Sequence, residues 1–181
     1  EELFDRILTI PIWKPSTRVM DRFPDRSFLT KLGLSEPKFT DGEWHEILFA
    51  FSQLKKTGKM VALVTNSALA NNPTLKIRQF LVENGNIESI IELPDRLLEN
   101  VGIELYAVVL SHDNKGVKFL DASQAYTEQR RKKNIDVDIV LENLGNPDIC
   151  TFESIESIAR EDYNLLPKRY TIKTNIRSEE R

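Results

Sequence analysis

Short apolar runs alternate along the chain with longer stretches in which apolar residues recur every three or four positions. The first of these longer stretches contains Trp44, Ile47, Leu48, Phe51 and Leu54. This spacing predicts an amphipathic helix over residues 41–55. Thr40 and Glu43 have the spacing of a capping box at its start, and Lys55 and Gly58 are typical of its end.

The short apolar runs are typical of strands, and they cover residues 4–9, 60–64, 87–93, 104–111 and 117–120. A second helix is predicted between Asn72-Pro73 and Gly85. Helical patterns follow over residues 124–133, 137–144 and 152–159. The polar loop between the last two strands ends in Gly116, which indicates a hairpin of antiparallel neighbours. This order of elements predicts an α/β fold with a mainly parallel sheet and an antiparallel edge. Residues 14–39 show no sustained period, which is typical of a functional or disordered loop.

Composition narrows the class of protein. The 181 residues, 40% of them hydrophobic, fit one globular domain, and the net charge of −3 means that DNA binding would need a local basic patch or a basic partner. A single cysteine excludes an internal disulfide and indicates a cytoplasmic protein. No apolar run reaches the roughly 18 residues of a membrane span, so we expect no membrane contact. Because the sequence lacks an initiator Met and starts just before a strand, we expect a segment of a longer protein.

Several familiar kinds of site are missing from the sequence. It has no glycine-rich phosphate loop and no hydrolase elbow, and two distant histidines with one cysteine give no zinc pattern, so we expect no bound metal. His45 and His112 are expected to be partly packed or surface side chains, and Cys150 a small buried one. Asp5, Glu92 and Asp95 lie near predicted strand ends, where an unrelated small α/β enzyme would place its carboxylates.

The densest basic run consists of Arg130, Arg131, Lys132 and Lys133. One interpretation is a solvated helix end, where cations suit the helix dipole. The other is a contact with DNA phosphates or with an acidic partner.

A series of segments, taken in order, resembles a known family. The segments are FDRIL with the turn after it, GEWHEILFAFSQLKKTGKMVALVTNSAL, KIRQFLVENGNIESIIELP, GIELYAVVL, VKFLDAS and REDYNLLPKRY. Together they resemble the N6-adenine DNA methylase family, specifically the modification (methyltransferase) subunit of type I restriction–modification systems. The resemblance covers residues 4–170.

The resemblance implies the second half of a class I, Rossmann-like methyltransferase sheet over residues 1–122. A helical extension packed on that sheet is then expected over residues 123–170, and a disordered tail over residues 171–181. The family uses S-adenosylmethionine, and it acts with DNA and a specificity subunit. The half of the fold that holds the cofactor has no counterpart here, so we expect this chain not to bind S-adenosylmethionine by itself.

The family's catalytic turn, Asn-Pro-Pro-Phe/Tyr, corresponds to Ile10, Pro11, Ile12 and Trp13. In the family the Asn oxygen and a backbone carbonyl accept hydrogen bonds from the amino group of a flipped adenine, and the aromatic ring stacks on the base. Isoleucine has no acceptor, although Trp13 could still stack. The alternative is a purely structural turn packed into the core.

Two functions therefore stay open. One is a portion of a type I DNA adenine-N6 methyltransferase subunit that is inactive alone, with a degenerate catalytic turn. The other is a non-catalytic scaffold that binds a partner subunit or DNA through residues 14–39 or through the C-terminal helices. Whether the chain is itself an enzyme is not decided by its sequence.

Overall fold

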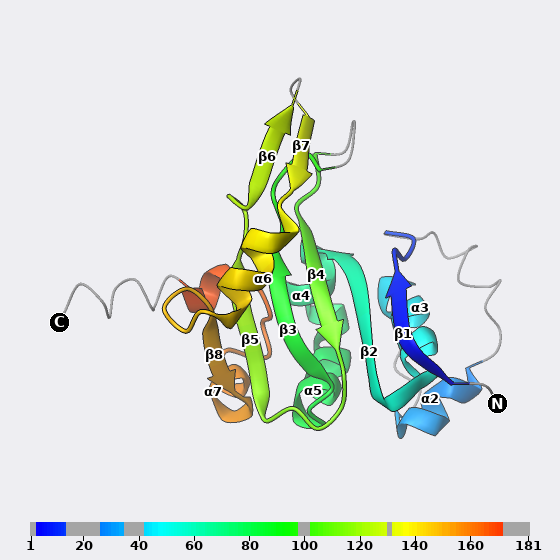
Figure 1. The fold of residues 1–181 in the computed structure, drawn as a ribbon. Coiled ribbons are helices and arrows are strands. Elements are labelled where there is room, and N and C mark those ends of the chain that lie inside the picture. The colour runs from blue at the N-terminus through cyan, green and yellow to red at the C-terminus, as the bar shows by residue number, and fades with distance from the viewer. Residues whose placement is uncertain (1–2, 14–25, 35–41, 98–101, 130–131, 172–181) are drawn as a thin grey trace.

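The computed structural model describes residues 3–13, 26–34, 42–97, 102–129 and 132–171 (Figure 1). Its centre is a six-stranded sheet with the order β1-β2-β4-β3-β5-β8. The strands are β1 (Phe4–Thr9), β2 (Leu54–Thr65), β3 (Ile87–Glu92), β4 (Leu105–Leu110), β5 (Gly116–Asp121) and β8 (Thr151–Ser154). Strands β1, β2, β3 and β5 run in one direction, while β4 and β8 run in the other. The predicted α/β class with a mainly parallel sheet is confirmed.

Helices cover both faces of this sheet. They are α2 (Ser27–Leu32), α3 (Gly42–Phe51), α4 (Asn66–Ala70), the 3-10 turn η1 (Asn72–Thr74), α5 (Leu75–Glu83), α6 (Val137–Gly145) and α7 (Ile155–Arg160). Figure 1 shows α4, α5 and α7 behind the sheet and α6 in front of it. The larger core cluster lies on the α3–α5 and α7 side, and a smaller one lies under α6. Within the described ranges, no helix is long and apolar enough to cross a membrane.

Helix α3 confirms the first periodic pattern, but it is shorter than predicted. The residues that set the pattern are all buried: Trp44, Ile47, Leu48, Phe51 and Leu54. The helix ends at Phe51, and residues 55–58, expected as its end, belong to β2. Leu54 already lies opposite Phe4 in the parallel pair β1–β2. Strand pairing with a distant segment therefore overrides the local signals for a helix end.

The predicted hairpin between β4 and β5 is wrong, because β3 lies between them. Strand β4 pairs antiparallel with both β2 and β3, and β5 pairs parallel with β3. The loop from β4 to β5 therefore crosses the start of β3 at Gly85. There the Asn114 N–H donates to the Gly85 carbonyl at 3.0 Å, and a Cβ on Gly85 would lie 2.4 Å from the Asn114 carbonyl oxygen. Only glycine fits this crossing.

The region after residue 123 is less helical than expected. A helix was predicted over residues 124–133, but the described residues of this range contribute to two antiparallel strands, β6 (Tyr126–Gln129) and β7 (Lys132–Ile135). These strands form a hairpin that projects beyond the main sheet (Figure 1). The stretch predicted as a helix over 152–159 divides into β8, which pairs with β5, and α7. Helix α6 confirms the prediction for 137–144. Residues 172–181 of the predicted tail, and residues 14–25 and 35–39 of the predicted loop, lie outside the described residues.

The segment after α7 returns to the larger core cluster, on the face of the sheet that α3–α5 and α7 cover. The Leu165 N–H donates to the Leu69 carbonyl at the end of α4, at 3.0 Å. Tyr170 is fully buried, stacks on Phe119 with ring centroids 4.0 Å apart, and donates its hydroxyl to the Asn164 carbonyl. The segment thus ties the elements that follow β2 to the middle of the sheet.

Candidate active-site edge

The turn of Ile10, Pro11, Ile12 and Trp13 lies at the carboxyl end of β1, beside the carboxyl end of β2. Thr9 lies opposite Ala62 in the β1–β2 pair, so the turn continues alongside the last residues of β2. Pro11 is buried, but 59% of Ile10 and 50% of Ile12 is exposed. The expectation of a turn packed into the core is therefore wrong for both isoleucines.

Two hydrogen bonds hold this turn to neighbouring elements. The Trp13 indole N–H donates to the Leu63 carbonyl at 3.1 Å, and the partly buried ring packs against the cluster under α6. The Ile12 backbone N–H donates to the Glu46 carboxylate on α3 at 3.3 Å. The ring of Trp13 is therefore fixed by β2, while the side chain of Ile10 offers no hydrogen-bonding group.

Glu43 positions the next segment of the same edge. Its fully buried carboxylate accepts hydrogen bonds from the backbone N–H of Thr65 at 3.0 Å and from the Thr65 hydroxyl at 2.8 Å. The indole N–H of Trp44 donates to the Ala68 carbonyl in α4 at 2.9 Å. The start of α3 thus holds the junction between β2 and α4. The capping-box spacing predicted that Glu43 caps its own helix together with Thr40, which lies outside the described residues. The structure shows Glu43 bound to Thr65 instead.

A group of carboxylates lies further along this edge, separated from the turn by β2 and β4. Glu92 ends β3 opposite Asp121 at the end of β5, and Tyr106 donates its hydroxyl to Glu104 at 3.2 Å. Burial, and then the charge of Asp121, raises the pKa of Glu92. One buried oxygen of Glu92 has no hydrogen-bond partner among the described residues. The carboxylate is therefore less stable in its ionised form than an exposed one.

The other predicted carboxylates do not join this group. Asp5 is ion-paired with Lys55 at 2.9 Å, and Asp95 is paired with Lys133 and with Arg96. In the part of the chain that the structure describes, no cluster of His, Cys, Asp and Glu could hold a metal ion.

The histidines and the cysteine are structural side chains. His45 is buried edge-on to Phe28 with ring centroids 5.0 Å apart, and burial lowers its pKa. His112 packs on Phe51 with ring centroids 4.9 Å apart, and burial lowers its pKa as well. Cys150 is buried as predicted, and burial raises the pKa of its thiol, which makes a poor nucleophile.

The described part of the basic run, Lys132 and Lys133, lies in strand β7 and not at a helix end, so the helix-end interpretation is wrong for these two residues. Arg130 and Arg131 lie outside the described residues, and Lys132 begins β7. The ammonium group of Lys133 pairs with Asp95 and lies 4.0 Å from the ring centroid of Tyr126. Lys133 therefore serves to hold the hairpin against the main body of the chain.

The chain is similar to a family of known proteins. The model of the N-6 DNA methylase family matches residues 1–179. The chain belongs to the N-6 DNA methylase family. The methylase subunit of the type I restriction enzyme MjaVII from Methanocaldococcus jannaschii is 31% identical over 148 residues, which make up 74% of this chain and 25% of that protein. This N-6 DNA methylase chain thus spans a quarter of the length of that relative.

Solved structures share the fold. The methyltransferase subunit of a type I restriction–modification system from Streptococcus thermophilus matches with a TM-score of 0.80 and 24% identity, over 94% of this chain and 38% of that one. A nuclease-deletion mutant of the type ISP enzyme LlaGI, solved in complex with a DNA substrate mimic, matches with a TM-score of 0.52 and 15% identity, over 83% of this chain and 17% of that one. The resemblance to type I methyltransferase subunits is confirmed, and the fold is theirs.

The family implies S-adenosylmethionine, but the described residues do not fit a complete site for it. Cofactor sites of open α/β sheets use a glycine-containing turn directly after a strand. None of the glycines of the described segments directly follows β1, β2 or β3. What this edge offers is the turn after β1, beside the carboxyl end of β2.

Proposed function

We propose that this chain forms the part of a type I DNA adenine-N6 methyltransferase subunit that carries the substrate-facing turn, and that it transfers no methyl group by itself. The observation that carries the proposal is the position of Ile10, Pro11, Ile12 and Trp13 at the carboxyl end of an edge strand. In open α/β sheets, ligands bind at that end of the strands, in a crevice with walls on both sides.

The outer side of β1 supports the need for a second wall. Phe4 is 51% exposed and Leu8 74% exposed, and a groove of about 360 Å³ runs between β1 and Phe49 of α3. Among the described residues, no strand pairs with this side of β1. An apolar, unpaired edge of this kind is a template for a further strand. We infer that the cofactor-binding part of the enzyme continues the sheet here.

The isoleucine at position 10 limits catalysis even in a complete enzyme. An adenine amino group directed at this side chain meets no acceptor, and an unsatisfied buried donor costs about 1–3 kcal/mol. Removing one positioning group from a transition state commonly lowers the rate by about 10²–10³-fold. Trp13 keeps the stacking part of the recognition, worth about 1–3 kcal/mol per base. The expected result is a base-binding turn with a weak catalytic effect.

The proposed partners follow from the family and from its relatives. The methyl donor of the proposed enzyme is S-adenosylmethionine, and the part of the enzyme that continues the sheet beyond β1 binds most of it. Duplex DNA is the substrate, as the DNA substrate mimic bound to the similar LlaGI suggests. A specificity subunit completes the complex, which we expect in the cytoplasm.

A scaffold function is the second candidate, and one surface favours it. On α6, Val137 is 55% and Leu141 61% exposed, and one turn of helix separates them. Residues four apart share a helix face, so these two side chains form an apolar strip able to bind a partner subunit. This function requires no chemistry at Ile10.

A direct test incubates the purified chain with labelled S-adenosylmethionine and duplex DNA. We expect no labelled N6-methyladenine, and its formation would contradict the proposed inactivity. A second test replaces the matched region of the Streptococcus thermophilus subunit with residues 4–170 of this chain. If the chimera folds and binds S-adenosylmethionine and DNA, the methyltransferase proposal is supported. The scaffold function would be favoured by two results together. The folded chimera would bind neither S-adenosylmethionine nor DNA, and the isolated chain would still capture a specificity subunit.

Salt-dependent DNA retention tests the hairpin separately. Reversing the charges of Arg130 and Arg131 should weaken retention if they contact phosphates, because each lost phosphate contact reduces the dependence on salt. Reversing Lys55 and Lys56 is the matched control. Equal retention by all three proteins would exclude Arg130 and Arg131 from DNA binding.

A further inference from the structure

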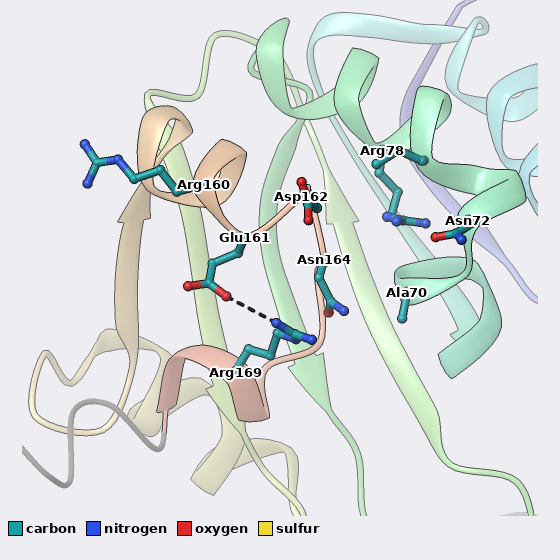
Figure 2. Close-up of a pocket in the computed structure, with 9 residues that line it drawn as sticks. Ala70, Asn72, Arg78, Arg160, Glu161, Asp162, Asn164 and Arg169 are labelled. Carbon is teal, nitrogen blue, oxygen red and sulfur yellow. Dashed lines mark hydrogen bonds and ion pairs between the residues drawn. The ribbon is translucent and has the colours of Figure 1, made fainter.

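A polar cavity of about 580 Å³ lies on the face of the sheet that α4, α5 and α7 cover (Figure 1), between α5 and the segment after α7. Figure 2 shows Asn72 and Arg78 on one side of it, and Asp162, Asn164 and Arg169 on the opposite side. The turn after β1 contributes no residue to the cavity. Apart from Ala70 at the end of α4, its lining residues lie outside the candidate active-site edge.

Arg78 is the unusual residue of this cavity. It is only 2% exposed, and its hydrogen bonds go to neutral acceptors. Its Nε donates to the Tyr163 carbonyl at 2.7 Å, and its Nη1 donates to the Asn71 carbonyl at 2.7 Å and to the Thr74 hydroxyl. Within the described segments, no carboxylate forms an ion pair with it. A buried charge without a counter-charge is unfavourable, and burial accordingly lowers the pKa of Arg78 to about 10.

The backbone around Arg78 is organised to hold the guanidinium in place. Asp162 and Tyr163 have left-handed φ values of 53° and 51°, which non-glycine residues seldom adopt. This conformation directs the Tyr163 carbonyl at Arg78, while the Tyr163 hydroxyl donates to Glu83 at 2.6 Å. The guanidinium is therefore fixed before any ligand arrives, which reduces the entropy lost on binding.

The rest of the lining includes two further arginines, Arg160 and Arg169, and two carboxylates, those of Glu161 and Asp162. Arg169 is half exposed and is paired with Glu161 at 3.2 Å (Figure 2). Asp162 is exposed and has no ion pair among the described residues, and Asn164 adds an amide. Two guanidinium groups suit an anionic oxygen group, and a carboxylate with amides suits hydroxyl groups.

We propose that this cavity binds a small sugar phosphate, with its phosphate between Arg78 and Arg169 and its hydroxyl groups donating to Asp162. Guanidinium groups bind phosphate oxygens through paired, charge-assisted hydrogen bonds, and the bound phosphate supplies the counter-charge that Arg78 lacks. The volume lies within the range of small-molecule sites and exceeds what a phosphate ion alone would fill. This inference does not depend on the methylation proposal.

Titration calorimetry with ribose 5-phosphate as the probe tests the site on the whole chain. We expect saturable binding and a rise in the Tm of the protein. Arg169→Gln should weaken binding about 10–100-fold, the usual effect of losing a hydrogen bond to a charged group. Arg96→Gln is the matched control, since Arg96 is also an exposed arginine paired with a carboxylate, that of Asp95, but lies outside the cavity. It should bind like the parent.

Arg78→Lys gives a second test, because it keeps the charge but loses the planar fork. We expect weaker binding from a protein that still unfolds cooperatively. Absence of saturable binding to the parent, or unchanged binding to Arg169→Gln, would overturn the proposal. Inorganic phosphate binding as tightly as the probe would refute the role of Asp162. Displacement of the probe by a short DNA duplex would show a DNA surface and refute a small-molecule site.

Discussion

Gly85→Ala probes the crossing on which the strand order depends. Gly85 has a left-handed φ of 63°, and its carbonyl accepts hydrogen bonds from the Asn114 backbone N–H at 3.0 Å and from the Asn114 side-chain amide at 2.9 Å. A non-glycine residue in this conformation costs about 1–2 kcal/mol. The new methyl group would also lie 2.4 Å from the Asn114 carbonyl oxygen, so the loop must move away. Weakening one or both hydrogen bonds adds about 0.5–1.5 kcal/mol each.

The expected loss of unfolding free energy for Gly85→Ala is therefore about 2–4 kcal/mol, which corresponds to a Tm lower by about 5–15 °C in a chain of this size. Urea unfolding followed by circular dichroism measures it. Gly145→Ala is the control, because no atom lies within 4 Å of a Cβ built there and its φ is not left-handed. It should change stability by less than about 1 kcal/mol. If the two variants were equally stable, β3 would not cross the loop as described.

Three further predictions concern the edge of the sheet and the closing segment. In the Streptococcus thermophilus chimera, Ile10→Asn should raise the methylation rate about 10²–10³-fold by restoring an acceptor. Leu8→Asn, the same kind of change at an exposed position of the preceding strand, should not raise it. Equal rates would exclude the role given to position 10. Glu92→Gln should stabilise the chain at neutral pH, because the raised pKa of Glu92 means that ionisation of its carboxyl group opposes folding. The gain in unfolding free energy should vanish below about pH 4, where this carboxyl group is protonated in the folded and in the unfolded chain. A gain that persists in acid would contradict this reasoning. Tyr170→Phe should lower the unfolding free energy by about 0.5–1.5 kcal/mol, because one hydrogen bond is lost. Tyr170→Ala should lower it by about 3–5 kcal/mol, because the missing ring leaves a cavity. Equal losses in urea unfolding would mean that the ring is not packed on Phe119.

The elements that sequence could predict are those whose signals are local. The helical spacing behind Trp44 predicts α3 because one face of a helix repeats every three to four residues. The continuous apolar run at Met60 predicts the core of β2, in which Met60, Ala62 and Val64 are fully buried. The position of the turn after β1 could also be anticipated, since it follows from the end of a strand.

The error in strand order concerns a partner that lies far away in sequence. No residue near Gly116 indicates that β3 lies between β4 and β5. The short polar loop that joins β4 and β5 therefore predicted a hairpin of these two strands. The strands β6 and β7 pair with each other, and Lys133 of β7 also forms an ion pair with Asp95, which is distant in sequence. The cavity around Arg78 was missed for the same reason. The only sequence signal was an arginine within a largely apolar helix, and its acceptors lie at residues 71, 74 and 163.

The insertion of β4 between β2 and β3 has a consequence for how the chain reaches its native state. During synthesis β2 and β3 leave the ribosome first, and neither can pair with the other, because the place between them belongs to a strand that emerges later. Both expose unsatisfied backbone groups until β4 enters antiparallel to each. Assembly of such non-local pairs is slow and leaves edges open to association with other chains. We therefore expect nascent chains that stop before residue 105 to bind chaperones, and release to follow once β4 is available.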